Sequence, residues 1–184
     1  MLPPVTENPI RPAVRLRDVT LADADRFDEI RRREMSDGGF NDFGLEPTPV
    51  DREALARGPL RDDHHGVLLI ERVADRRAIG TIGWHRVRYG PNPASDAWMF
   101  GIDLEPDARG QGHGTEAQRM LADRLFETTA LNRVEASTDV DNLAEQRSLE
   151  KAGFTREGVN RGAQFRGGTY HDLVLYARLR SDPR

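Results

Sequence analysis

GIDLEPDARGQGHGTEAQRML, residues 101–121, ends an apolar segment, carries three glycines within positions 110–114 and then opens an amphipathic segment. Glycine costs about 0.5–1 kcal/mol relative to alanine inside a regular element, so a glycine cluster needs a physical reason. The first N–H groups of a helix lack intrahelical partners and lie at the positive end of its dipole. The stretch therefore predicts a strand-to-helix loop whose backbone holds a phosphate. A tight turn capped by Thr115 is the structural alternative.

Two familiar phosphate-binding patterns do not fit this loop. A dinucleotide fingerprint needs a third glycine three positions after Gly112, where this chain has Thr115. A P-loop needs a lysine before the final Ser or Thr, and Gly114 precedes Thr115 directly. The pattern that remains is R-x-x-G-x-G, formed by Arg109, Gly112 and Gly114.

The rest of the chain predicts one α/β (α+β) domain with a mixed sheet. Apolar alternation and short apolar runs predict strands over residues 14–19, 66–73, 78–88, 97–104, 132–138 and 170–179. Helical periodicity predicts helices from Thr20 to near Arg33 and over residues 50–58, 115–128 and 142–153. We expect the order β-α-α-β-β-β-α-β-α-β-β within a domain at 13–180, with an extended or disordered lead at 1–12 and a tail at 181–184.

Composition excludes several classes of protein. The 184 residues carry a net charge of −4 and no cysteine. The first property argues against a nucleic-acid partner, and the second excludes disulfides, thiolate metal sites and a cysteine nucleophile. We expect no signal peptide, no membrane segment and a cytoplasmic location. His64 and His65 beside Asp62 and Asp63 lack a further well-spaced ligand, so we expect no metal.

Two stretches together resemble the GNAT acetyltransferase superfamily, and most closely its RimJ/RimL-type branch. They are residues 101–121 and NRVEASTDVDNLAEQRSLEKAGFTREG, residues 132–158. Four features occur in the family's order: residues 109–115, which we call the glycine loop, the helix after it, an asparagine that opens the next helix, and KAGF at the end of that helix. The resemblance covers residues 14–179. It implies a mostly antiparallel mixed sheet, splayed at the cofactor site and flanked by helices on both faces, and acetyl transfer from acetyl-CoA to an amine.

The resemblance also implies which residues hold acetyl-CoA. It assigns the pantetheine arm to Ile102, Asp103 and Leu104. Asn142 matches the asparagine that contacts the cofactor. Asn142 and Glu145 also have the form of a capping box, and both roles can coexist. The pyrophosphate is assigned to the backbone amides of Arg109, Gly110, Gln111, Gly112, His113, Gly114 and Thr115.

The catalytic positions depart from the family pattern. Leu149 stands where many members have a tyrosine, and Glu145 stands where RimJ/RimL-type members often have a serine. Ser148, on nearly the same helical face as Glu145, is the candidate proton donor, and a serine tolerated on a packed helix is the alternative. Asp103 and His85 are the candidate bases, with a water chain to solvent as the alternative.

The acceptor side is expected at the first two helices, their loop and the closing strand. The loop predicted at 34–49 combines carboxylates with aromatic rings, which suits a cationic, partly apolar amine. Its carboxylates are Glu34, Asp37, Asp42 and Glu46. The candidate acceptor-binding residues are Phe40, Asp42, Phe43, His171 and Asp172. A protein N-terminal amine, an amino-acid derivative and an amine-bearing antibiotic all remain possible acceptors.

Three functional hypotheses follow from these residues. The first is an acyl-CoA-dependent N-acetyltransferase acting by direct attack in a ternary complex. The second is a non-catalytic acyl-CoA-binding sensor or interaction module of the same fold. The third, a dinucleotide oxidoreductase, requires the glycine that Thr115 replaces. A homodimer is expected only by analogy with relatives.

Overall fold

The structure, a computed structural model, describes residues 12–36 and 39–183. The predicted lead therefore lies outside the described residues except for Pro12, as do Asp37 and the last residue of the predicted tail. The helices are α1 (Ala24–Ser36), α2 (Arg52–Arg57), α3 (His113–Thr128) and α4 (Leu143–Lys151). The strands are β1 (Val14–Asp18), β2 (His65–Arg72), β3 (Ala78–Arg88), β4 (Asp96–Leu104), β5 (Arg133–Asp139), β6 (Thr155–Arg166) and β7 (Thr169–Leu179). Their order along the chain confirms the predicted one.

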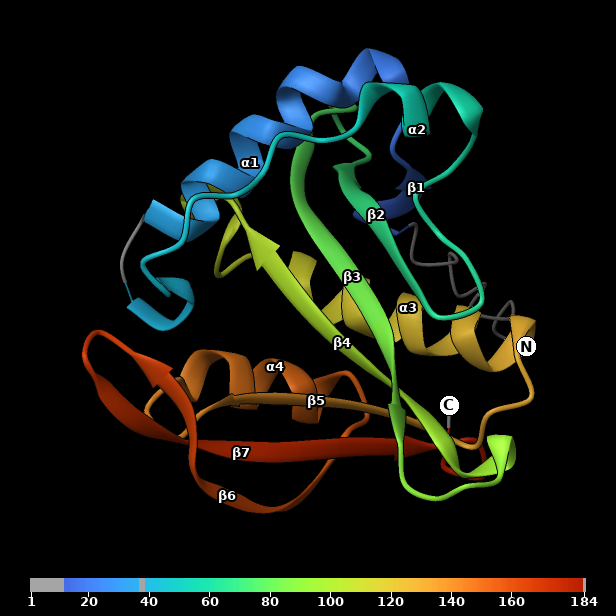
Figure 1. Ribbon diagram of the computed structural model, residues 1–184, viewed down its shortest axis with the longest axis vertical. Helices are drawn as coiled ribbons and strands as arrows, with labels where there is room; N and C mark the ends of the chain where they lie inside the picture. The colour runs from blue at the N-terminus through green and yellow to red at the C-terminus, as the bar shows by residue number, and fades with distance from the viewer. Residues whose placement is uncertain (1–11, 37–38, 184) are drawn as a thin grey trace, which may run out of the picture.

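The strands form one seven-stranded sheet in the order β1-β2-β3-β4-β5-β7-β6 (Figure 1). Every neighbouring pair is antiparallel except β4 and β5, which run parallel. The sheet is therefore mixed, as the sequence patterns predicted, and mostly antiparallel, as the resemblance implied. The single parallel pair lies next to the glycine loop in the chain, because β4 leads directly into it.

Helices cover both faces of the sheet, and β2 shows why. Leu68 and Ile70 point to one face, into the core that contains the apolar side of α3 and α4, whereas Leu69 points to the other face. That second core contains Phe27 and Ile30 of α1. Because successive strand side chains alternate between faces, a run of apolar residues is expected in a strand covered on both sides.

The predicted end of the first helix was wrong by about one turn. Helix α1 continues to Ser36 rather than ending near Arg33. Arg33 binds Glu29 one turn earlier and also the buried carboxylate of Glu105, which holds this last turn against the end of β4. Glu34 consequently lies on a helix and not in the loop where the sequence placed it.

The start of α3 and the position of β6 also differ from expectation. Helix α3 begins at His113, two residues early, because Gly112 adopts a left-handed conformation with φ 84° and serves as the N-cap. Thr115 is therefore inside the helix and does not cap it. Strand β6, whose range the sequence did not indicate, begins just after Gly153, which ends α4 with φ 89°.

The described helices include none that is both long and apolar enough to cross a membrane.

Candidate active site

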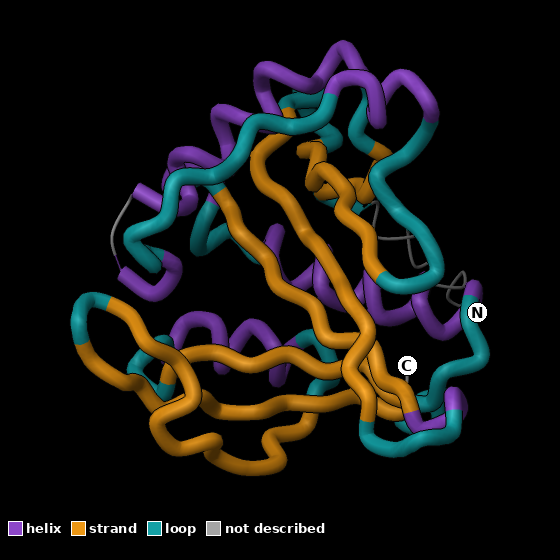
Figure 2. The backbone as a smooth tube through the Cα atoms, in the orientation of Figure 1, coloured by secondary structure: helices purple, strands orange, loops and turns teal. Residues whose placement is uncertain are grey.

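Strands β4 and β5 are paired over a very short distance. Trp98 faces Val134 and Met99 faces Glu135, and beyond these two pairs the strands diverge (Figure 2). A cavity of about 750 Å³ occupies the opening, and we call it the strand cleft. Its walls are residues 100–104 of β4, residues 136–139 of β5, the glycine loop, α4 and the turn Gly39–Asn41. Strands that separate leave backbone groups available for a ligand that pairs as an added strand would.

The glycine loop opens on the strand cleft with its backbone exposed. Gly110 and Gly112 have φ angles of 73° and 84°, which L-residues with a Cβ rarely adopt. Within the described residues, the N–H groups of 110–115 have no hydrogen-bond acceptor, whereas the N–H of Arg109 donates to the carbonyl of Pro106. These free amides lie at the N-terminal end of the α3 dipole, so the loop is suited to an anion.

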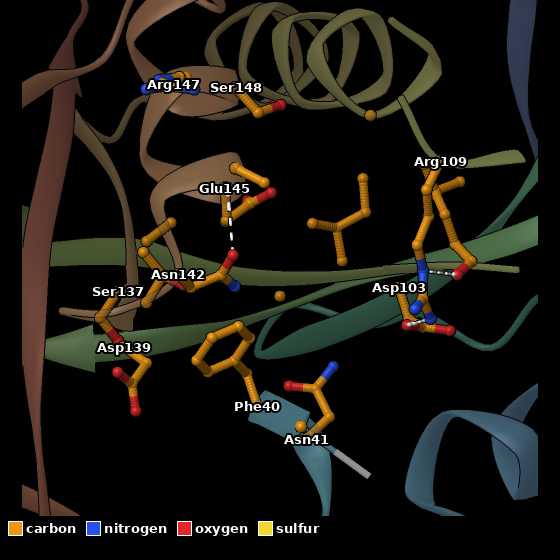
Figure 3. Close-up of a pocket in the computed structure, with 18 of the residues that line it drawn as sticks. Phe40, Asn41, Asp103, Arg109, Ser137, Asp139, Asn142, Glu145, Arg147 and Ser148 are labelled. Atoms are coloured by element: carbon orange, nitrogen blue, oxygen red, sulfur yellow. Dashed lines mark hydrogen bonds and ion pairs between the residues drawn. The ribbon is translucent and has the colours of Figure 1, made fainter. Parts of the chain in front are cut away.

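Side chains of the glycine loop form hydrogen bonds to backbone carbonyls of the segment that precedes it. The Arg109 guanidinium donates from Nε to the carbonyl of Leu104 at 2.7 Å and lies 3.5 Å from the Asp103 carboxylate (Figure 3). Gln111 donates to the carbonyl of Asp107, and the buried His113 ring contacts the carbonyl of Ala108 through Nδ1 at 3.2 Å. Neither side chain lines the strand cleft, so the groups that Gln111 and His113 offer to an anion at the loop are their backbone amides.

A chain of hydrogen bonds joins α3 to α4 along one wall of the strand cleft. The Thr115 and Ser148 hydroxyls lie 3.0 Å apart, and Ser148 donates to Oε1 of the fully buried Gln118 at 3.3 Å. Gln118 in turn donates from Nε2 to the Glu145 carboxylate at 2.6 Å. Because Gln118 accepts the Ser148 proton, the Thr115 hydroxyl donates to Ser148. The proton of Ser148 is thus directed into the wall and away from the cleft.

Glu145 does not form the second half of the predicted capping box. Asn142 does cap α4, accepting from the N–H of Glu145 at 3.2 Å, but the Glu145 carboxylate bonds to Gln118 on the neighbouring helix. Burial raises the pKa of Glu145 from 4.5 to about 7, against the lowering effect of the Gln118 hydrogen bond. Within the described residues the amide nitrogen of Asn142 has no hydrogen-bond partner, so Asn142 can cap the helix and still donate to a ligand.

Two further carboxyl groups line the strand cleft opposite the wall formed by α3 and α4. Glu34 of α1 and the buried Asp103 of β4 both line the cavity. Burial and, to a smaller extent, repulsion by Asp103 raise the pKa of Glu34 from 4.5 to about 7, while Arg31 and Arg109 oppose the shift. Sequence patterning missed this pair because Glu34 was assigned to a loop.

Of the other residues predicted to bind the acceptor or to act as a base, only some line the strand cleft. His85 is exposed on β3 and lines neither of the two cavities described in the structure. Phe40 lines the strand cleft, whereas Asp42 and Phe43 lie outside it. Asp172 accepts a hydrogen bond from the N–H of Gly162 in the β6–β7 hairpin.

His171 belongs to a buried ionic cluster that crosses the rim of the strand cleft. Arg166 of β6 donates to Asp139 of β5 at 2.5 Å and to the carbonyl of Phe40 at 2.6 Å, with its guanidinium over the Phe40 ring. The His171 ring contacts Arg166 and Asp139 at 3.2 and 3.3 Å. This cluster fastens the turn after α1 to the closing strands and fixes one edge of the opening.

The histidine pair at 64–65 lies at the start of β2, where Asp62 holds its backbone. Asp62 accepts from the N–H groups of His64 and His65 and lies 3.0 Å from Nδ1 of His65. Among the described residues no group of three His, Asp or Glu side chains is arranged to hold a metal ion.

Comparison with known proteins identifies the family. Residues 13–155 match the acetyltransferase (GNAT) domain. The chain is 34% identical over 119 residues to the probable N-acetyltransferase YjcK of Bacillus subtilis, covering 65% of this chain and 62% of that protein. It is 32% identical to the uncharacterized N-acetyltransferase YoaA of the same organism, covering 73% and 77%. It is 29% identical to the ribosomal-protein-serine acetyltransferase of Escherichia coli, covering 55% and 54%. The match thus covers less than two thirds of the length of YjcK and of the Escherichia coli enzyme.

Solved structures share the whole fold at lower identity. The RimL ribosomal L7/L12 alpha-N-protein acetyltransferase in complex with coenzyme A has a TM-score of 0.72 at 18% identity, covering 93% of this chain and 96% of that one. Spermidine N-acetyltransferase of Vibrio cholerae, in complex with CoA and spermine, has a TM-score of 0.71 at 20% identity, covering 94% and 98%. RimJ of Mycobacterium smegmatis has a TM-score of 0.69 at 24% identity, covering 92% and 84%. With a mixed sheet splayed at a glycine loop and a domain match over most of its length, this chain belongs to the GNAT acetyltransferase family and has the fold of its RimJ/RimL-type members.

Proposed function

We propose that the protein is an acetyl-CoA-dependent N-acetyltransferase that binds acetyl-CoA in the strand cleft and acetylates a primary amine. One observation carries the proposal: the N–H groups of residues 110–115, without acceptors in the described part of the chain, open on a cleft formed by two diverging strands. Phosphates fit the first feature, and an amide-bearing arm fits the second. Ile102, Asp103 and Leu104 supply the strand edge for that arm, and Asn142 supplies a side-chain donor.

The reaction asks little of the protein beyond positioning and two proton transfers. The amine attacks the thioester carbonyl, and a backbone N–H of the unpaired part of β4 stabilises the oxyanion, a contribution of about 3–4 kcal/mol. The departing thiolate then needs a proton. Glu145 is better suited than Ser148 to supply it, because Glu145 lines the cleft with a pKa of about 7 and Ser148 donates its proton to Gln118.

The acceptor class follows from the family only in outline. The names of a curated relative and a structural neighbour mention a ribosomal protein and spermidine as acceptors of those proteins. Both offer primary amines, and this common group is what we assign to the acceptor here.

Release of free coenzyme A tests the proposal. The protein is incubated with acetyl-CoA and a panel of peptides with free N-termini, polyamines and amino-acid derivatives, and thiol is measured with a chromogenic disulfide. The chain has no cysteine and so adds no thiol of its own. We expect release that depends on one class of amine. Tight binding of acetyl-CoA with no amine-dependent release would refute the enzyme and favour the acyl-CoA sensor.

A further inference from the structure

A second cavity lies on the α1 and α2 side of the sheet. It has a volume of about 780 Å³ and is bounded by α1, α2, the segments beside α2 and strands β2 to β4; we call it the α1–α2 cavity. Figure 1 shows α1 and α2 lying beside these strands. The residues common to its lining and that of the strand cleft are Glu34, Gly101, Ile102 and Asp103. The two cavities therefore meet at the diverging end of β4.

Near this junction, strands β3 and β4 line the α1–α2 cavity with backbone that carries no side chain. Gly83 of β3 and Gly101 of β4 are direct partners in the sheet, so two glycines face the cavity side by side. A Cβ built on Gly101 would meet no atom within 4 Å. Glycine inside a strand weakens it, and its presence there often marks close approach of a ligand to the backbone.

The junction itself carries two carboxyl groups, one from each wall. Asp103 comes from β4 and is 9% exposed, and Glu34 comes from α1. The charged groups that act on Glu34 are Asp103, Arg31 of α1 and Arg109 of the glycine loop. Arg109 lies 3.5 Å from Asp103 and, with Arg31, offsets part of the negative charge, but burial beside Asp103 still makes ionisation of Glu34 costly. The junction therefore favours a proton or an incoming cation at Glu34. An ammonium group meets this requirement.

We propose that the α1–α2 cavity holds the body of the acceptor, and that Glu34 and Asp103 bind its ammonium group, from which Glu34 takes the proton. This inference rests on the proposed N-acetyltransferase function and assigns the acceptor side of the same site. In this inference Glu34, and not the exposed His85, acts as the base. It also moves the acceptor away from His171 and Asp172, which lie in the hairpin contacts described above.

The proton balance is complete with groups already named. R–NH₃⁺ gives one proton to Glu34, which passes it to solvent. The amine then forms a C–N bond to the acetyl carbon as the C–S bond breaks, and the nitrogen loses a second proton to solvent through Glu34. Glu145 protonates the thiolate and recovers a proton from solvent, so each turnover releases one proton overall. The raised pKa of Glu34, about 7, suits a base that works near neutral pH.

The lining of the α1–α2 cavity has an apolar part beside its charged residues, which besides Glu34 and Asp103 are Arg31, Asp51, Arg61, Asp62 and His65. Phe27 of α1, Val67 of β2, and Val50 and Leu60 beside α2 contribute apolar surface. A primary ammonium at the junction would therefore be carried on an apolar chain that lies over Gly83. We assign the acceptor to primary alkylamines or amine termini with an aliphatic chain next to the amine.

Two variants separate this inference from the proposed function. Glu34→Gln removes the base. Gly83→Ala adds a methyl group on the α1–α2 side of the sheet, 3.3 Å from the carbonyl oxygen of Gly66, and Gly83 does not line the strand cleft. Glu29→Gln on the same helix is the matched control, since Glu29 pairs with Arg26 and Arg33 and lines neither cavity. Each variant is titrated with acetyl-CoA by calorimetry and then assayed with the best amine from the panel.

We expect acetyl-CoA affinity to be unchanged in all three variants, which also shows that each is folded. Glu34→Gln should lower kcat/KM for the amine by about 10²–10⁴-fold and abolish the rise in rate around pH 7. Gly83→Ala should raise the KM of the amine about tenfold, as one added methyl group in a fitted pocket does. Glu29→Gln should match the wild type. Active wild-type enzyme with unaltered amine kinetics in both test variants would overturn this inference alone, and a wild type that acetylates no amine would overturn both proposals.

Discussion

Replacing Glu145 with glutamine should change how the stability of the protein depends on pH. Glu145 is a half-buried carboxyl in the wall of the strand cleft, hydrogen bonded to the buried Gln118. Glutamine keeps the shape and the carbonyl oxygen that accepts from Gln118 but cannot ionise. The comparison therefore isolates the cost of a negative charge at this position.

The size of the effect follows from the pKa. Burial raises the pKa of Glu145 from 4.5 to about 7. Between these values the folded chain binds more protons than the unfolded chain, so stability is fully present below about pH 4.5 and is lost as the pH rises through 7. At about 1.4 kcal/mol per pH unit, the wild type should lose about 2.5 kcal/mol from this group between pH 5 and pH 8. The Glu145→Gln variant should not.

Urea unfolding of both proteins at several pH values measures the effect. The difference at pH 5 gives the packing cost of the substitution, and its change up to pH 8 gives the charge contribution. Glu34, whose pKa is also raised, titrates in both proteins and cancels from the difference. We expect the variant to gain about 2.5 kcal/mol relative to wild type over this range. A difference constant to within about 0.5 kcal/mol would refute the account of Glu145 as a buried acid of raised pKa.

Two substitutions test the polar contacts around the strand cleft. Ser148→Ala should lower the unfolding free energy by about 1–2 kcal/mol, because Thr115 and Gln118 each lose a partner. It should reduce turnover by less than about tenfold, and a loss of 10²-fold or more at unchanged acetyl-CoA affinity would restore Ser148 as the proton donor. Arg166→Met should destabilise the fold by about 3 kcal/mol in urea unfolding, since it leaves the Asp139 carboxylate buried without its main cation. A loss below about 1 kcal/mol would contradict the structural role given to this cluster.

Local sequence patterns predicted the elements well where the pattern and the packing agree. The range of β3 was predicted as observed. The apolar face of α3 was predicted from Ala117, Met120, Leu121 and Leu125, of which Met120 is only partly buried and the other three are buried. The glycine loop was recognised because its glycines adopt conformations that other residues avoid, a property visible in the sequence itself.

The parts that were missed depend on contacts between distant residues. Helix α1 continues past Arg33 because of an ion pair with Glu105, which lies far along the chain, and this extension brings Glu34 to the cleft. Glu145 has the local form of a capping residue, but its partner is Gln118 on another helix. A buried glutamine on an otherwise apolar helix face was the one available signal that a polar partner lay opposite.

Calorimetric titration of acetyl-CoA into wild type, Gly112→Ala and Gly44→Ala tests the central claim most directly. Both glycines have positive φ angles, and a Cβ at either meets no atom within 4 Å, but only Gly112 lines the strand cleft. An L-residue in the left-handed region costs about 1–2 kcal/mol, so the two variants carry similar backbone strain. We predict micromolar binding of acetyl-CoA and no binding of NAD by wild type, equal acetyl-CoA affinity in Gly44→Ala, and at least about tenfold weaker binding in Gly112→Ala, where the loop amides can no longer surround the phosphates. Equal affinity in all three proteins would contradict the assignment of the glycine loop to coenzyme A.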